Sequence, residues 1–222
     1  MEAVALRRGG ENVGGGRLER VRTRVETAER VPPPFLRPAL LIGAALLMLA
    51  AIFLPLWGMT LASIQYPEGL RMIVYPMRMA GDIAEINALN RYIGMAQISP
   101  EYFGELRVIV GMFAASAVLC AAAAVFRRKW IAAAPLALLA IAATFGFWRM
   151  RARLYQYGHE LDPTAAIEIA PFTPPMLGEN QIAQFGTYSY FSWGTILPIV
   201  AAVLVSAALW LDVRGMPKLR RR

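Results

Sequence analysis

The sequence predicts an all-α polytopic membrane protein, because four long runs of it are apolar and free of charged residues. The runs cover residues 39–57, 108–126, 130–148 and 193–211, and each approaches the roughly 20 residues that cross a hydrocarbon core of about 30 Å. None contains Lys, Arg, Asp or Glu, and one such residue near a helix centre costs on the order of 3 kcal/mol. With 57% hydrophobic residues and a mean hydropathy of +0.45, the chain carries more apolar surface than a soluble domain of this size usually hides. We therefore expect four transmembrane helices.

The basic residues predict how the helices are oriented. Of the 23 Lys and Arg residues, 16 lie in three segments, 1–37, 127–129 and 212–222. By the positive-inside tendency, these segments face the cytoplasm, which is an N-in/C-in topology. The long loops 58–107 and 149–192 then form an extracytoplasmic cap. The net charge of +8 is explained by this distribution and by contact of the tails with anionic lipid, so we expect no nucleic-acid partner.

The predicted domains follow from these spans. Residues 1–37 combine glycines with alternating Arg and Glu, which predicts a flexible basic cytoplasmic tail. Residues 38–212 form the four-helix membrane domain, with Pro38 in the first turn of the first helix. Residues 213–222 form a second basic cytoplasmic tail.

The first loop is expected to begin extended and then to become helical. The residues before Pro67 and Pro76 are disfavoured in a helix, which predicts an extended segment after Trp57. Asp82 is expected to cap an amphipathic helix over residues 83–92. A further helix is expected to open at residues 99–101 and to continue through the second span.

The second loop is expected to be less regular. The third span is predicted to extend beyond Trp148 to Tyr155, with its arginines 149, 151 and 153 snorkelling at the lipid headgroups. Several prolines and glycines then predict an irregular or short-stranded segment over 159–192. Cys120 is the only cysteine, so no intramolecular disulfide can form.

Methionines in the loops are candidate ligands for a soft metal ion. Met77-Arg78-Met79 places two thioethers close together, and thioethers select Cu(I) over harder ions. Met95 and His159, the only histidine, complete the predicted copper ligands, and Met59, Met72 and Met176 are further methionines in the loops. The alternative is that these methionines fill gaps as adaptable hydrophobic residues and that the histidine is a solvated loop residue.

Enzymatic and transport functions are disfavoured by the same sequence. It contains no nucleophile motif, no paired histidines and no phosphate-binding glycine loop, so we expect a non-enzymatic protein. The polar residues within the spans are all small, whereas transporters place ionisable groups in their spans. Alanine-rich runs over 114–124 and 132–143 suit close packing of helices within the protein or against another subunit.

Two motifs of the first loop carry a resemblance to a known family. They are Tyr66-Pro67-Glu68-Gly69-Leu70 and the segment 87–95, which contains Asn87, Asn90, Arg91, Tyr92, Ile93, Gly94 and Met95. Together with Pro174-Pro175-Met176-Leu177-Gly178, they resemble a family of four-helix proteins of the bacterial inner membrane, over about residues 50–212. Members of that family often accompany copper-handling accessory proteins of nitrous-oxide reductase. The resemblance implies a role in copper delivery or in assembly of a copper enzyme.

The chain departs from the family pattern at Arg91, where a histidine is common. Arginine cannot ligate a metal, so the second motif is interpreted mainly as structural. In that interpretation Asn87 and Asn90 hold the segment 66–70 by hydrogen bonds, Gly94 permits a tight turn, and Glu68 pairs with Arg91 in the interior.

Three functional hypotheses remain. The leading one is a membrane accessory protein that assists copper handling or assembly of an extracytoplasmic or membrane cuproenzyme, with a membrane or periplasmic protein as its partner. The alternative is a structural subunit of a respiratory-type membrane complex. The third is a sensor whose cap binds a ligand and whose basic tail contacts a cytoplasmic protein.

Overall fold

The computed structural model describes residues 33–99, 104–126, 128–167, 169–182 and 185–214. Every element described below belongs to one compact unit, Phe35–Arg222. Most of the predicted N-terminal tail and of the C-terminal tail lies outside the described residues.

Four helices are long and apolar enough to cross a membrane, as predicted. They are α2 (Leu36–Phe53), α4 (Leu106–Val125), α5 (Lys129–His159) and α6 (Trp193–Arg214). α5 continues past Trp148, as expected. α2 ends earlier than predicted, because Leu54 precedes Pro55 and takes an extended conformation with ψ of 152°.

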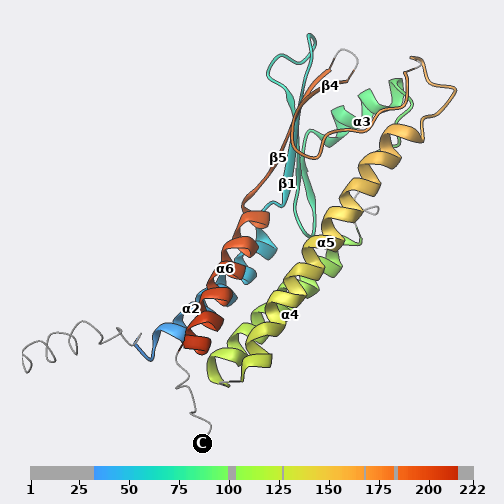
Figure 1. Ribbon diagram of the computed structural model, residues 1–222. Helices are drawn as coiled ribbons and strands as arrows, with labels where there is room; N and C mark the ends of the chain where they lie inside the picture. Colours follow the sequence, from blue (N-terminus) through green and yellow to red (C-terminus); the bar gives the residue numbers. More distant parts are fainter. Residues whose placement is uncertain (1–32, 100–103, 127, 168, 183–184, 215–222) are drawn as a thin grey trace, which may run out of the picture. The chain divides into compact units, whose positions relative to one another are not determined.

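The helices pack through small side chains. α2 packs against both α6 and α4, α4 packs against α5, and α5 contacts α6 (Figure 1). Small residues at these contacts let helix backbones approach closely, as in other membrane bundles. The fully buried alanines of this core are Ala44, Ala51, Ala123, Ala132 and Ala201.

A five-stranded antiparallel sheet joins the two loops, so the all-α prediction is wrong there. Its strands are β1 (Trp57–Ala62), β2 (Leu70–Val74), β3 (Met79–Gly81), β4 (Gly178–Ile182) and β5 (Phe185–Phe191), in the order β3-β2-β1-β5-β4. β1 follows α2 directly and pairs along its length with β5, which leads directly into α6. The sheet therefore arises where the two loops meet, a long-range pairing that local proline and glycine patterns do not indicate.

The sheet has one face towards the protein interior. Along β1, Trp57, Met59 and Leu61 alternate with residues that point to the opposite face. On β5, Thr187 and Ser189 are buried on the inner side, with only 3% and 0% of their surface exposed. The predicted helix over 83–92 is confirmed as α3 (Ile83–Tyr92), and its buried Ile86 packs into the same core as Met59.

The N-terminus of the second span differs from expectation. α4 begins at Leu106, and residues 104 and 105 form a turn rather than helix. The predicted helix start at residues 99–101 falls largely on residues outside the described part of the chain.

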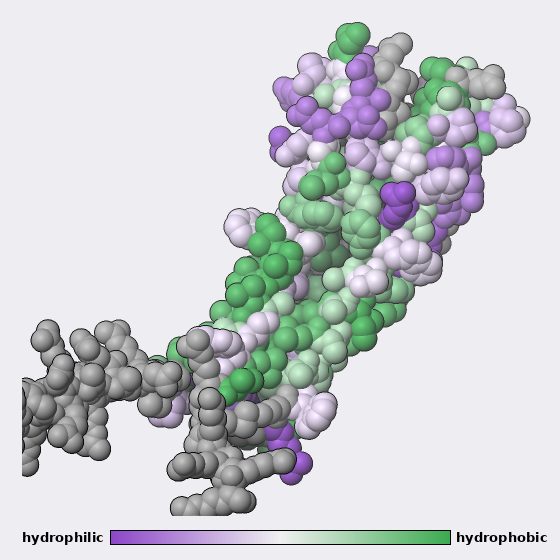
Figure 2. All heavy atoms as spheres, viewed as in Figure 1, coloured by the Kyte–Doolittle hydropathy of each residue, from purple (hydrophilic) through white to green (hydrophobic). Residues whose placement is uncertain are grey.

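We call the five strands, α3 and the described segments that connect them the cap. It is tied to the helices at the junction of β1 and β5. The Thr195 hydroxyl donates to the Leu56 carbonyl at 2.8 Å, and the Gly194 N–H donates to the Pro55 carbonyl at 2.8 Å. Hydrophobic side chains cover the helices and hydrophilic side chains gather on the cap (Figure 2).

Candidate binding cavity

A cavity of about 600 Å³ lies where the helices meet the cap. This volume falls within the roughly 300–1,000 Å³ of typical small-molecule sites. Its walls come from α4, α5, α6, α3 and the inner face of the sheet. Among the lining residues are Trp57, Met59, Met72, Ile86, Met95, Leu106, Phe113, Leu136, Ala143, Met150, Tyr157, Thr187 and Ala202.

One face of α5 supplies the longest wall. Leu136, Leu139, Ala143, Gly146 and Met150 recur at spacings of three and four, which places them on a single helix face. The sheet supplies the facing wall through the alternate residues of β1 and β2 that point inward. The wall is almost entirely apolar, so the cavity favours an apolar occupant over a polar one.

Some residues of α5 and α6 that line the cavity are also exposed. Phe147 of α5 and Ile199 of α6 line it and are nevertheless 58% and 61% exposed. Both belong to helices that are apolar enough to cross a membrane.

Among the described residues, three charged ones line the cavity, and both arginines contact the one glutamate. Glu105 accepts hydrogen bonds from Arg149, and from Arg153 Nη2 at 3.0 Å. Their side chains are half-buried, with 36%, 29% and 25% of their surface exposed. The snorkelling interpretation is thus incomplete for Arg149 and Arg153, which share one carboxylate, while Arg151 is exposed.

The methionines fall into different environments. Met59 and Met72 are direct partners in the β1–β2 register and line the cavity together with Met95 and Met150. Met77 is 67% exposed on the turn between β2 and β3, and it is not among the residues that line the cavity. The thioethers that the structure brings together are thus those of Met59 and Met72, and not the predicted pair Met77 and Met79.

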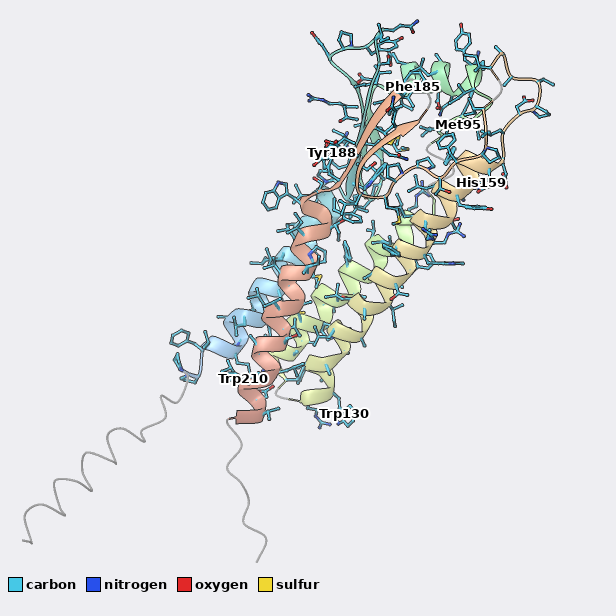
Figure 3. The ribbon with its side chains drawn as sticks, turned by 45° about the horizontal axis from the view of Figure 1, so that its top comes forward. Met95, Trp130, His159, Phe185, Tyr188 and Trp210 are labelled. Carbon is cyan, nitrogen blue, oxygen red and sulfur yellow. The ribbon has the colours of Figure 1, made fainter. Side chains whose placement is uncertain are left out.

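Met79 and His159 do not line this cavity, whereas Met95 does. Met79 pairs with Val74 on the inner face of the sheet. The ring of His159 stacks on Tyr155 at 3.8 Å, and its Nδ1 lies 3.0 Å from the Tyr155 carbonyl oxygen. Met95 also lines a smaller cavity with Glu160, the neighbour of His159. Met95 and His159 are labelled in Figure 3. Within the described part of the chain, no group of three or more His, Cys, Asp or Glu side chains is placed to hold a metal.

The first motif forms the turn between β1 and β2. The Gly69 N–H donates to the Tyr66 carbonyl at 3.0 Å, and Pro67 between them has the fixed φ that this turn needs. Gly69 has φ of +76°, which favours glycine. Glu68 and Arg91 are both exposed, so the predicted buried pair is not formed.

The second motif closes α3 and holds the segment after it. Asn87 makes two bonds to Ile98, accepting from its N–H at 2.6 Å and donating to its carbonyl at 2.9 Å. Asn90 is buried and donates to the Ala96 carbonyl at 3.4 Å. These partners replace the predicted ones in 66–70. The Met95 N–H bonds to the Asn90 carbonyl across Gly94, whose φ is +75°, which is a Schellman cap.

The second loop forms hydrogen bonds with the residues that end α3. The Asp162 N–H donates to the Gly94 carbonyl at 2.8 Å, and the Ile167 N–H donates to the Tyr92 carbonyl at 3.0 Å. The Asp162 carboxylate accepts from the Thr164 hydroxyl at 2.7 Å and from its N–H at 2.8 Å, and these bonds lower the pKa of Asp162. The motif 87–95 therefore acts structurally here, as a joint between the two loops.

Sequence reasoning missed the cavity because its walls come from both loops and three helices. A partial signal exists in the spacing of Arg149 and Arg153, since residues four apart share a helix face. Glu105, just before an apolar span, is a natural counter-charge for that face. No protein-family model matches the chain, and a search of curated proteins finds no match for it.

Proposed function

We propose that the protein is a non-enzymatic membrane accessory protein that holds an apolar chain from the bilayer in the cavity. The observation that carries the proposal is a cavity of about 600 Å³ with apolar walls, lined in part by exposed residues of α5 and α6. Water gains little in such a space, whereas an apolar chain fills it at a gain of about 25 cal/mol per Å² of buried apolar surface.

The proposed orientation is N-in/C-in, with the cap outside the cytoplasm. It rests on the basic residues at the end of the helices remote from the cap, among them Arg37 and Arg128. In this orientation the proposed entrance to the cavity, between α5 and α6, faces the outer leaflet. The protein would then serve as a carrier or holder of a lipid-like molecule for a partner in the same membrane.

The test is whether the purified protein retains an apolar molecule that a bulky side chain expels. Ala143 lines the cavity, so Ala143→Phe should reduce the amount retained at least several-fold in native mass spectrometry and solvent extraction. Ala137 is exposed on the same helix and does not line the cavity, so Ala137→Phe is the matched control. Equal retention by all three proteins would contradict the proposal. A protein partner held at fixed ratio instead would support the structural-subunit alternative.

Copper handling is the second candidate, and the pairing of Met59 with Met72 favours it. Their thioethers belong to opposite residues on neighbouring strands, where Cβ atoms lie about 4.5–5.5 Å apart. Two such ligands, with a third from Met95 or Met150, suit Cu(I). The resemblance of the motifs 66–70 and 87–95 points to the same role.

Competition against a chromophoric Cu(I) chelator under reducing conditions separates the possible sites. A cavity site predicts that Met59→Leu with Met72→Leu loses Cu(I), while Met77→Leu does not. The site predicted from sequence, made of Met77, Met79, Met95 and His159, requires the opposite result. Absence of Cu(I) binding by the intact protein would contradict both.

A further inference from the structure

We infer that the occupant of the cavity is an anionic phospholipid, with its headgroup at Arg149 and Arg153 and one acyl chain along α5. The inference rests on the proposed function, since it names the class of molecule that the cavity holds. The charges at the cavity and the length of its wall support it.

The charge balance of the lining favours an anion. Of the described residues that line the cavity, only Glu105, Arg149 and Arg153 are charged, which leaves one positive charge in excess. The three side chains are half-buried, so this charge is less screened than a charge on the open surface. Arginine is the side chain best suited to a phosphate, because its planar donors match two oxygens at once.

The two arginines lie on α5 at the depth where we expect the lipid headgroups. Trp148 and Tyr155 flank them and are 60% and 55% exposed, and exposed aromatic residues of this kind mark the membrane interface. The Arg149 guanidinium lies 5.5 Å from the centre of the Trp148 ring. The charged group of a bound lipid would therefore stay at its normal depth.

The apolar wall below the arginines is long enough for an acyl chain. From Arg149 to Leu136 the lining runs along 13 residues of α5, which is about 20 Å at 1.5 Å per residue. One leaflet of the hydrocarbon core is about 15 Å thick. A chain anchored at Arg149 can thus lie in the cavity over its whole depth.

The experiment offers full-length protein an equimolar mixture of phosphatidylglycerol and phosphatidylcholine and counts the lipids retained by native mass spectrometry. The intact protein should retain phosphatidylglycerol about five-fold over phosphatidylcholine, the effect of one basic residue near a membrane surface. Arg153→Gln should abolish this preference, and Glu105→Gln should increase it. Arg151→Gln, the same change at an exposed position on the same helix, should leave it unchanged.

The outcomes separate this inference from the proposed function. If the intact protein retains both lipids equally and Ala143→Phe loses both, the inferred selectivity for an anionic headgroup is wrong, whereas the proposed binding of a lipid in the cavity stands. The inferred headgroup site is also wrong if Arg151→Gln and Arg153→Gln reduce the preference for phosphatidylglycerol equally, because general surface charge then explains that preference. Retention of no lipid by the intact protein overturns the proposed function as well.

Discussion

Gly94 is the residue on which the joint between the two loops depends. Its φ of +75° is strained for any residue with a side chain, and a Cβ there would lie 2.8 Å from the Asp162 carbonyl oxygen. We predict that Gly94→Ala lowers the free energy of unfolding by about 1–3 kcal/mol, the usual cost of a residue forced into this conformation. Thermal unfolding in detergent measures it.

Gly111→Ala is the control for that experiment. Gly111 lies inside α4, and a Cβ added there meets no atom within 4 Å. Alanine is the better helix former by up to about 1 kcal/mol, so this variant should be as stable as the native protein or more stable. If Gly94→Ala is equally well tolerated, the joint does not have the role we give it.

Asp162 should make this joint sensitive to acid. Its pKa is lowered in the folded protein from the ordinary value of 3.8, first by the hydrogen bond from the Thr164 hydroxyl and then by that from its N–H. A lowered pKa adds stability that is present above the unfolded value and is lost as the pH falls through the folded value. Asp162→Asn, which mimics the neutral acid, should be less stable than the native protein at pH 6.

The difference in melting temperature between these two proteins should shrink as the pH is lowered below 3.8. Its size will be small, because the carboxylate is exposed and screened by solvent. A difference that stays constant between pH 6 and pH 3 would show that the charge of Asp162 does not contribute.

Among the elements, α2 and α6 are tied at the end remote from the cap by a buried ion pair. Arg37 Nε lies 2.7 Å from Asp212 Oδ1, and Arg37 Nη1 donates to the Ala123 carbonyl of α4 at 2.9 Å. Only 8% and 21% of the two side chains are exposed. Asp212→Asn leaves the guanidinium buried without a counter-charge and should cost about 3–5 kcal/mol.

The double variant distinguishes this effect from simple loss of packing. Replacing both members of a buried pair by apolar residues is often neutral. Arg37→Met with Asp212→Leu should therefore recover most of the stability that Asp212→Asn loses, as measured by thermal unfolding. A double variant that is as unstable as the single one would contradict a charge-based explanation.

The elements also show what the sequence allows one to predict. The four apolar helices and α3 follow from local patterns, namely charge-free runs and helical spacing, and the structure confirms them. β5 carries a local pattern too, since Phe185, Thr187 and Ser189 alternate with residues of the other face. Short strands were one of the two expectations for 159–192, but the prolines and glycines there did not indicate which residues form them. The extended conformation after Trp57 was predicted as well, but the pairing of β1 with β5 was not, because the two strands are more than 120 residues apart in the chain.

The candidate site was less predictable than the fold. Met95 was selected for its thioether and does line the cavity, but Met59 and Met72 were grouped only by the register of β1 and β2. Glu105 lies in the turn before α4 and the two arginines lie on α5, so only tertiary structure brings them together. Asn87 and Asn90 were expected to bond the segment 66–70, whereas their partners lie in the residues just after α3.

For the whole molecule, we predict that the cap faces away from the cytoplasm. In a background with Cys120→Ala, Ile64→Cys places a thiol at a residue that is 92% exposed in the cap. A membrane-impermeant maleimide should label it in intact cells, and should label Ala3→Cys only after the cells are permeabilised. Labelling in the reverse order would place the mouth of the cavity in the inner leaflet.

Trp57 can report directly whether a lipid chain occupies the cavity. Trp57 lines the cavity, is only 5% exposed, and donates through Nε1 to the Met176 carbonyl at 2.8 Å. A variant that keeps Trp57 and has the other four tryptophans replaced by Phe gives fluorescence from this position alone.

The decisive measurement is quenching of that fluorescence by phospholipids brominated on their acyl chains, after reconstitution into vesicles. We predict strong quenching in the variant with an open cavity and its loss when Ala143→Phe fills the space. Fluorescence that is unaffected by brominated chains, or quenched to the same extent with Ala143→Phe, would contradict occupation of the cavity by a lipid chain.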